Sequence, residues 1–119
     1  MEIIKIKNCP KFIAQDQAIV REIVSPRNSS VKNQSMAKVT IPHGSSILEH
    51  YHIKTEELYY VISGEGQMVI EGEFRTIGKG DAVVISPGQR HKVSNNGKID
   101  LVMLVTCAPA YQNEDQVIV

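Results

Sequence analysis

The stretch that decides the fold runs from residue 44 to residue 64 and reads GSSILEHYHIKTEELYYVISG. His50 and His52 are separated by one residue, and in a strand residues i and i+2 point to the same face. Both imidazoles can therefore reach one point in space. Glu57 begins the apolar run that follows, and Tyr59 and Val61 share its face if that run is a strand. The pattern allows two imidazoles and one carboxylate to gather at one place.

A third histidine could complete this group. His91 follows the turn formers at 86–88 and could return on a distant strand. Imidazole nitrogens with one carboxylate oxygen suit divalent iron, manganese, nickel, copper or zinc, and four protein ligands leave positions open in an octahedral site. A His-x-His pair alone is weak evidence, because two alternating histidines in a strand are more often exposed or structural. The candidate ligands for one divalent transition metal ion are His50, His52, Glu57 and His91.

Apolar residues elsewhere recur with a period of two or in short runs, which indicates strands rather than helices. No window of eleven or more residues holds a 3.6-residue period, and only one helical turn is predicted, around Pro10 to Gln17. Turn formers separate the runs about every ten residues, as in all-β sandwiches and barrels. The expected strands lie within 3–6, 19–24, 36–41, 58–62, 68–70, 74–77, 82–85 and 99–107, with further extended pieces carrying the histidines.

Length and charge bound the class of protein. The 119 residues predict one globular domain, 1–119, since domains cluster near roughly 100–150 residues. Thirteen Lys+Arg balance 13 Asp+Glu, so we expect no nucleic-acid partner. The longest apolar run, 101–105, is too short to span a membrane, and the N-terminus has no signal-peptide core. We expect a soluble, cytoplasmic protein in which Cys9 and Cys107 stay as thiols.

Two glycine-framed motifs make the chain resemble the cupin superfamily. The family's first motif, G-x5-H-x-H-x(3,4)-E-x6-G, is matched without a gap over residues 44–64. The second motif, G-x5-P-x-G-x2-H-x3-N, is matched over residues 80–95, with Ser86 where the family has proline and Pro87 one position later. The residues that match are Gly44, His50, His52, Glu57 and Gly64 in the first motif, and Gly80, Gly88, His91 and Asn95 in the second.

The resemblance implies a fold and a metal site. It implies a double-stranded β-helix, or jelly-roll barrel, of roughly six to eight strands, commonly dimeric, with a metal held inside. The ligands carried over are His50, His52, Glu57 and His91. The motif's spacing also admits Glu56, but Glu57 leaves the six residues that the motif requires before Gly64, so Glu56 is expected to face solvent.

Other polar residues are candidates for the site. Tyr59 could place a phenol near the metal as a catalytic proton donor, with core packing as the alternative. Arg21 and Lys38 each interrupt an apolar strand and could point into the barrel to anchor a substrate carboxylate or phosphate; the alternative is a solvated outer face. His43 is expected in an exposed loop, and Asn95 is expected to hold a turn, with donation to a bound ligand as the alternative.

Functions from different classes are compatible with this sequence. The first is a small metalloenzyme of the dioxygenase, decarboxylase, isomerase or lyase type, acting on a small oxygen-chelating acid or sugar. The second is a non-catalytic binding or sensor module for such a molecule, and the third is a structural barrel with a vestigial site. We expect a small-molecule ligand and a homodimer in which residues 111–119 add an edge strand across the interface.

Overall fold

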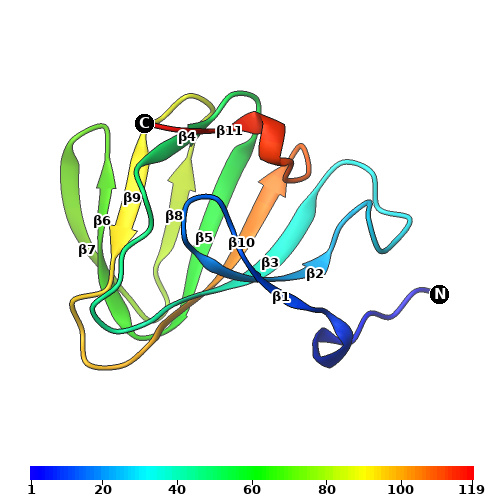
Figure 1. Ribbon diagram of the computed structural model, residues 1–119, viewed down its shortest axis with the longest axis horizontal. Coiled ribbons are helices and arrows are strands. Elements are labelled where there is room, and N and C mark those ends of the chain that lie inside the picture. Colours follow the sequence, from blue (N-terminus) through cyan, green and yellow to red (C-terminus); the bar gives the residue numbers. More distant parts are fainter.

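The computed structural model describes all 119 residues and contains two antiparallel β-sheets packed face to face (Figure 1). In the six-stranded sheet the strands lie in the order β1 (Lys11–Ile13), β2 (Ile19–Val24), β3 (Ser35–Ile41), β10 (Leu101–Ala108), β5 (Glu56–Ser63) and β8 (Ala82–Ile85). In the five-stranded sheet the order is β11 (Gln116–Ile118), β4 (His50–His52), β9 (His91–Ser94), β6 (Glu65–Ile70) and β7 (Glu73–Gly78). The predicted all-β jelly-roll fold is confirmed.

The period of two in the strands builds the core between the sheets. In β5 the side chains of Glu57, Tyr59 and Val61 are buried, while Leu58 and Tyr60 between them are exposed. Strand β10 alternates in the same way along its length. The inward side chains of both sheets form one cluster of 14 buried residues. Burial of this apolar surface, at about 25 cal/mol per Å², is the main force that holds the sheets together.

Most of the predicted strands are present, but the N-terminal 20 residues differ from the prediction. Residues 3–6 form no strand; a short 3₁₀ turn, Ile6–Asn8, follows instead. The helical turn predicted around Pro10 to Gln17 was wrong, because β1 and β2 form a hairpin there. The Asp16 carboxylate accepts a hydrogen bond from the backbone N–H of Ala18 at 3.0 Å, which closes this turn.

The C-terminal segment forms an edge strand within its own chain. Strand β11 pairs with β4, with Gln116 opposite His52 and Ile118 opposite His50, and Figure 1 shows it lying along β4. The edge strand expected in residues 111–119 is therefore present, and it pairs with β4 of its own chain rather than across a dimer interface. The 3₁₀ turns at Ile6–Asn8 and Asn113–Asp115 are the only helical segments, and neither is a helix able to cross a membrane.

Gly64, between β5 and β6, is a glycine that the fold requires. Its φ is +83°, and a Cβ at this position would overlap the backbone carbonyl of Asp100. Gly72, between β6 and β7, has a similar φ of +78° but open space around it. A residue with a Cβ would therefore carry the free-energy cost of a positive φ at either position, but only at position 64 would it also clash with the backbone.

Alanine substitutions at these two glycines separate the two costs. We expect Gly72→Ala to lower the free energy of unfolding by about 1 kcal/mol, the cost of a left-handed residue with a Cβ. We expect Gly64→Ala to lower it by about 3 kcal/mol or more, because the backbone must also move. Urea unfolding followed by circular dichroism measures both. Equal losses at the two positions would contradict the clash with Asp100.

Candidate metal centre

The four candidate ligands converge between the sheets. His50 and His52 come from β4, His91 from β9 and Glu57 from β5 of the other sheet. One ligand atom from each lies within 4.8 Å of the others, and all four side chains are buried. His50 stands opposite His91 in the register of β4 and β9. Sequence-distant strands thus bring together a group that could hold one metal ion.

Backbone carbonyls orient two of the imidazole rings. Nδ1 of His50 lies 2.7 Å from the carbonyl oxygen of Leu48, and Nδ1 of His91 lies 2.9 Å from that of Gln89. A carbonyl can only accept, so each Nδ1 carries the hydrogen in this assignment. In a neutral ring this leaves Nε2 with a free lone pair. Such a hydrogen bond on the far nitrogen is the usual support of a metal-binding histidine.

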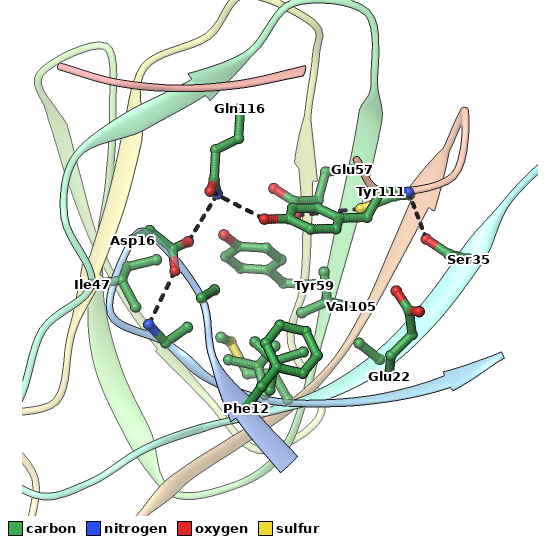
Figure 2. A pocket seen from close by; sticks show the side chains of 17 residues that line it. Phe12, Asp16, Glu22, Ser35, Ile47, Glu57, Tyr59, Val105, Tyr111 and Gln116 are labelled. Carbon is green, nitrogen blue, oxygen red and sulfur yellow. Dashed lines mark hydrogen bonds between the residues drawn. The ribbon is translucent and has the colours of Figure 1, made fainter. Parts of the chain in front are cut away.

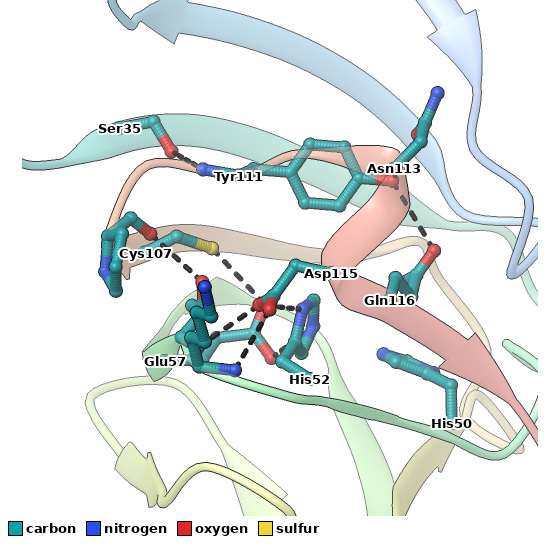
Figure 3. Close-up of polar contacts among 12 residues, drawn as sticks. Ser35, His50, His52, Glu57, Cys107, Tyr111, Asn113, Asp115 and Gln116 are labelled. Carbon is teal, nitrogen blue, oxygen red and sulfur yellow. Dashed lines mark hydrogen bonds and ion pairs between the residues drawn. The ribbon is translucent and has the colours of Figure 1, made fainter.

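His52 is the ring whose surroundings point most directly to a cation. It is 3% exposed, and neither of its nitrogens has a hydrogen-bond partner. Its Nε2 lies 3.5 Å from Oε1 of Glu57, and its Nδ1 lies 3.9 Å from Oδ2 of Asp115 (Figure 3). Leaving a buried polar atom without a partner costs free energy. A cation between Nε2 of His52 and Glu57 would remove that cost for this nitrogen.

The carboxylate of Glu57 meets the histidines. Its Oε1 lies 3.1 Å from Nε2 of His91, and the thiol of Cys107 donates to its Oε2 at 3.6 Å. Burial alone raises the pKa of Glu57, but the nearby imidazole of His52 and the contact with His91 outweigh burial and lower this pKa to about 2. Glu57 is therefore an anion at neutral pH. Because Nδ1 of His91 already carries a hydrogen, a proton or metal ion must separate Nε2 from the carboxylate.

The histidines differ in how their surroundings act on them. Burial lowers the pKa of His50, and the neighbouring His91 lowers it further, so His50 is neutral at pH 7. Burial also acts to lower the pKa of His52, but the adjacent carboxylate of Glu57 raises it overall. The donor set thus comprises the neutral imidazole of His50, the imidazoles of His52 and His91 beside the carboxylate, and the Glu57 carboxylate itself. This set fits a divalent transition metal ion.

A cavity of about 60 Å³ lies beside Glu57 (Figure 2). Its polar end is formed by Glu57, Asp16, Tyr59, Tyr111 and Gln116, and Figure 2 shows these side chains directed toward one another. The rest of the wall is mostly apolar and includes Ala18, Val20, Val39, Ile47, Met103 and Val105. A small molecule in this cavity would be next to a ligand of the candidate metal centre.

Two roles were considered for Tyr59, core packing and a phenol near the metal, and its location is compatible with both. Its ring belongs to the buried core, and its side chain also lines the cavity. Burial and the charge of Glu57 raise the pKa of the Tyr59 phenol well above its usual range. The hydroxyl therefore keeps its proton at neutral pH, and it is a hydrogen-bond donor at the polar end of the cavity.

Three residues at the polar end were not expected from the sequence. Oδ2 of Asp16 accepts a hydrogen bond from Nε2 of Gln116 at 3.0 Å and lies 3.5 Å from Nε2 of His50. The hydroxyl of Tyr111 lies 3.3 Å from Oε1 of Gln116. These residues come from the β1–β2 turn and from the C-terminal segment, which Figure 3 shows lying over His50 and His52. No motif or spacing in the sequence marks them.

Arg21 and Lys38 lie on the other face of their strands. The cavity is lined by Val20 and Glu22 of β2 and by residues 37 and 39 of β3. Alternate residues of a strand face opposite ways, so Arg21 and Lys38, which pair in the register of β2 and β3, point outward. This corrects the prediction that they point into the barrel to anchor a substrate. Arg21 instead donates to the carbonyl of Ile6 at 3.3 Å.

The remaining predicted roles agree with the structure. His43 and Glu56 are exposed. Asn95 is buried, and its Nδ2 donates to the carbonyls of Ile41 and Ile99 at 2.8 Å each. Its Oδ1 accepts from the N–H of Gly97 at 2.9 Å. Asn95 therefore fixes a turn, as expected.

Comparison with known proteins agrees with this architecture. The family model described as "Cupin domain" matches residues 37–107, and the chain belongs to the cupin family. The chain is 36% identical to the uncharacterized protein MJ1618 of Methanocaldococcus jannaschii over 117 residues, which cover 97% of this chain and 94% of that protein. It is 34% identical over 73 residues to an oxalate-binding protein of Thermotoga maritima, covering 61% of this chain and 60% of that protein.

The fold is shared with solved structures of low sequence identity. A structure of Streptomyces PAC13 with uridine superposes with a TM-score of 0.82 at 19% identity, covering 100% of this chain and 90% of that one. Pac13 is described as a nucleoside dehydratase. At this identity the likeness shows the common barrel alone.

Proposed function

We propose that the chain binds one divalent transition metal ion through His50, His52, Glu57 and His91, and that it acts as a metalloenzyme on a small molecule with oxygen donor atoms. The observation that carries the proposal is the convergence of three buried imidazoles on one buried carboxylate, with both nitrogens of His52 lacking a partner. Iron, manganese, nickel, copper and zinc all suit these donors, because imidazole and carboxylate do not select sharply among them.

The protein's own residues would prepare the ligand for reaction. A bound metal would supply Lewis acidity, which polarises an oxygen atom of the ligand. The carbonyls of Leu48 and Gln89 hold two imidazoles in place, so little reorganisation is needed. Most of the cavity wall is apolar, and the Tyr59 hydroxyl can donate to a ligand oxygen. The reaction class proposed is a dioxygenase, decarboxylase, isomerase or lyase reaction.

The second candidate function is binding without turnover. The name of the Thermotoga maritima relative, an oxalate-binding protein, favours it. Turnover assays on metal-loaded protein discriminate the two functions, because a binding module returns its ligand unchanged.

The cytoplasm is the compartment that we propose for this protein. The buried thiols of Cys9 and Cys107 form no disulfide, which is in keeping with a reducing compartment.

Elemental analysis tests the metal site. For protein purified without a metal-affinity tag, we expect about one transition metal ion per chain, since four buried donors form a single site. His52→Ala and Glu57→Ala are each expected to lose the metal. His43→Ala removes the one histidine outside the set and is expected to keep it. Wild-type protein that holds no metal and takes up no added divalent ion would overturn the proposal.

Tyr59→Phe tests the phenol at the polar end of the cavity. We expect unchanged metal content and a roughly tenfold lower affinity for hydroxyacetone, a small neutral chelator, because one buried hydrogen bond is lost. Calorimetry on metal-loaded protein measures this affinity. Tyr51→Phe, on the opposite face of β4, is the control and is expected to bind as the wild type does. If Tyr59→Phe binds as tightly as the wild type, the residue serves packing alone.

We also propose that the chain forms a homodimer through the outer face of the six-stranded sheet. Leu58, Tyr60, Ile62 and Val84 are exposed there by 39–63%. Leu58 pairs with Val84 across β5 and β8, so these side chains are neighbours. A contiguous apolar patch on a sheet is typical of an interface, and a two-fold axis would place it against itself.

Sedimentation of surface variants tests the dimer. We expect the wild type to be dimeric at micromolar concentration and Tyr60→Lys to be monomeric, because the substitution buries a charge against its symmetry mate. Phe74→Lys places the same charge on β7 of the other sheet, where Phe74 is 64% exposed, and is expected to remain dimeric. A monomeric wild type, or a dimeric Tyr60→Lys, would contradict this interface.

A further inference from the structure

We propose that the cavity beside the metal centre selects a small uncharged ligand over a carboxylate, and that Asp16 sets this selectivity. The inference rests on the proposed function, since it takes the ligand to bind at a metal held by the four-residue set. It goes further in assigning the chemical class of the ligand and a specificity residue outside the part of the chain that the family model matches.

The charge on the cavity wall is negative. No Lys or Arg lines the cavity, while Asp16, Glu22 and Glu57 all do. Glu22 is neutralised from outside, because Arg27 donates to both of its oxygens, at 2.8 and 2.6 Å. Asp16 and Glu57 remain. Together they balance the charge of a divalent ion held by neutral imidazoles, so the site offers an anion no net positive charge.

Asp16 is held rigidly and has no cationic side chain beside it. It is 6% exposed, and its Oδ1 accepts from the N–H of Ala18 while its Oδ2 accepts from Gln116. The hydroxyl of Tyr111 in turn fixes the amide of Gln116. The one titratable group within ion-pair distance of Asp16 is His50, itself a candidate metal ligand. Its charge therefore acts on whatever occupies the cavity, at short range and away from solvent.

The shape of the cavity gives the rest of the ligand's chemistry. A volume of about 60 Å³ admits a molecule of only a few non-hydrogen atoms. Ala18, Val20 and Val39 offer that molecule methyl groups and no polar atoms. A hydroxyl on the ligand could donate to Asp16, whereas a carboxylate in the same place would face a like charge. The ligand class is a small neutral hydroxycarbonyl compound or diol with an apolar end.

Two nearly isosteric probes separate charge from size. Hydroxyacetone and glycolate present the same O–C–C–O chelate, and the methyl group of the first is replaced by a carboxylate oxygen in the second. Oxalate extends the series of probes to a molecule with two negative charges. Affinities are measured by calorimetry on metal-loaded wild type, Asp16→Asn and Asp16→Ser, the serine variant keeping an acceptor for the N–H of Ala18. Asp100→Asn makes the same change at an exposed aspartate. Comparison of one ligand across variants cancels the metal's own preference for carboxylates.

We expect the affinity for glycolate and for oxalate to rise at least tenfold in both Asp16 variants. The affinity for hydroxyacetone is expected to stay the same or fall, and Asp100→Asn is expected to match the wild type. Anion affinities that do not rise in a folded, metal-loaded Asp16 variant would overturn the inference and leave the metal site standing. Metal content is measured on the same samples. A wild type without metal would overturn both this inference and the proposed function.

Discussion

One electrostatic constraint governs the candidate metal centre, the meeting of a buried carboxylate with three buried imidazoles. Glu57 is ionised, and His91 and His52 each turn a nitrogen toward its Oε1 at 3.1 and 3.5 Å. The lone pair of an imidazole nitrogen and a carboxylate oxygen repel each other unless a positive charge lies between them. The arrangement therefore requires a positive charge, a proton or a metal ion, between these side chains.

The two sheets supply the rigidity that such a site needs. Three donors stand on one sheet and the carboxylate on the other, so the distance between the sheets sets the size of the site. Carbonyls of the residues two positions before His50 and His91 hold these rings from behind. Side chains supported in this way lose little entropy on binding a ligand, which is a requirement for both tight metal binding and catalysis.

The C-terminal segment contributes residues that shape the cavity beside the candidate metal centre. Strand β11 continues the sheet beside β4, and its Gln116 reaches Asp16 of the β1–β2 turn at 3.0 Å. Asp115 of the same segment accepts from the N–H groups of Lys54 and Thr55, which secures the loop after His52. The two ends of the chain thus close the cavity together. Common barrel motifs place the metal ligands, and these terminal contacts shape what can bind beside them.

The amino-acid sequence by itself determined most of the strands, because a period of two in apolar residues shows which side chains share a face. The two glycine-framed motifs marked the four donors. The sequence could not determine which face of β2 lies inside, since all six residues of that strand are half-buried. Arg21 and Lys38 were therefore placed on the wrong side. Only the tertiary structure brought Asp16 and Gln116 together, because their contact spans 100 residues of chain and depends on packing that no local pattern records.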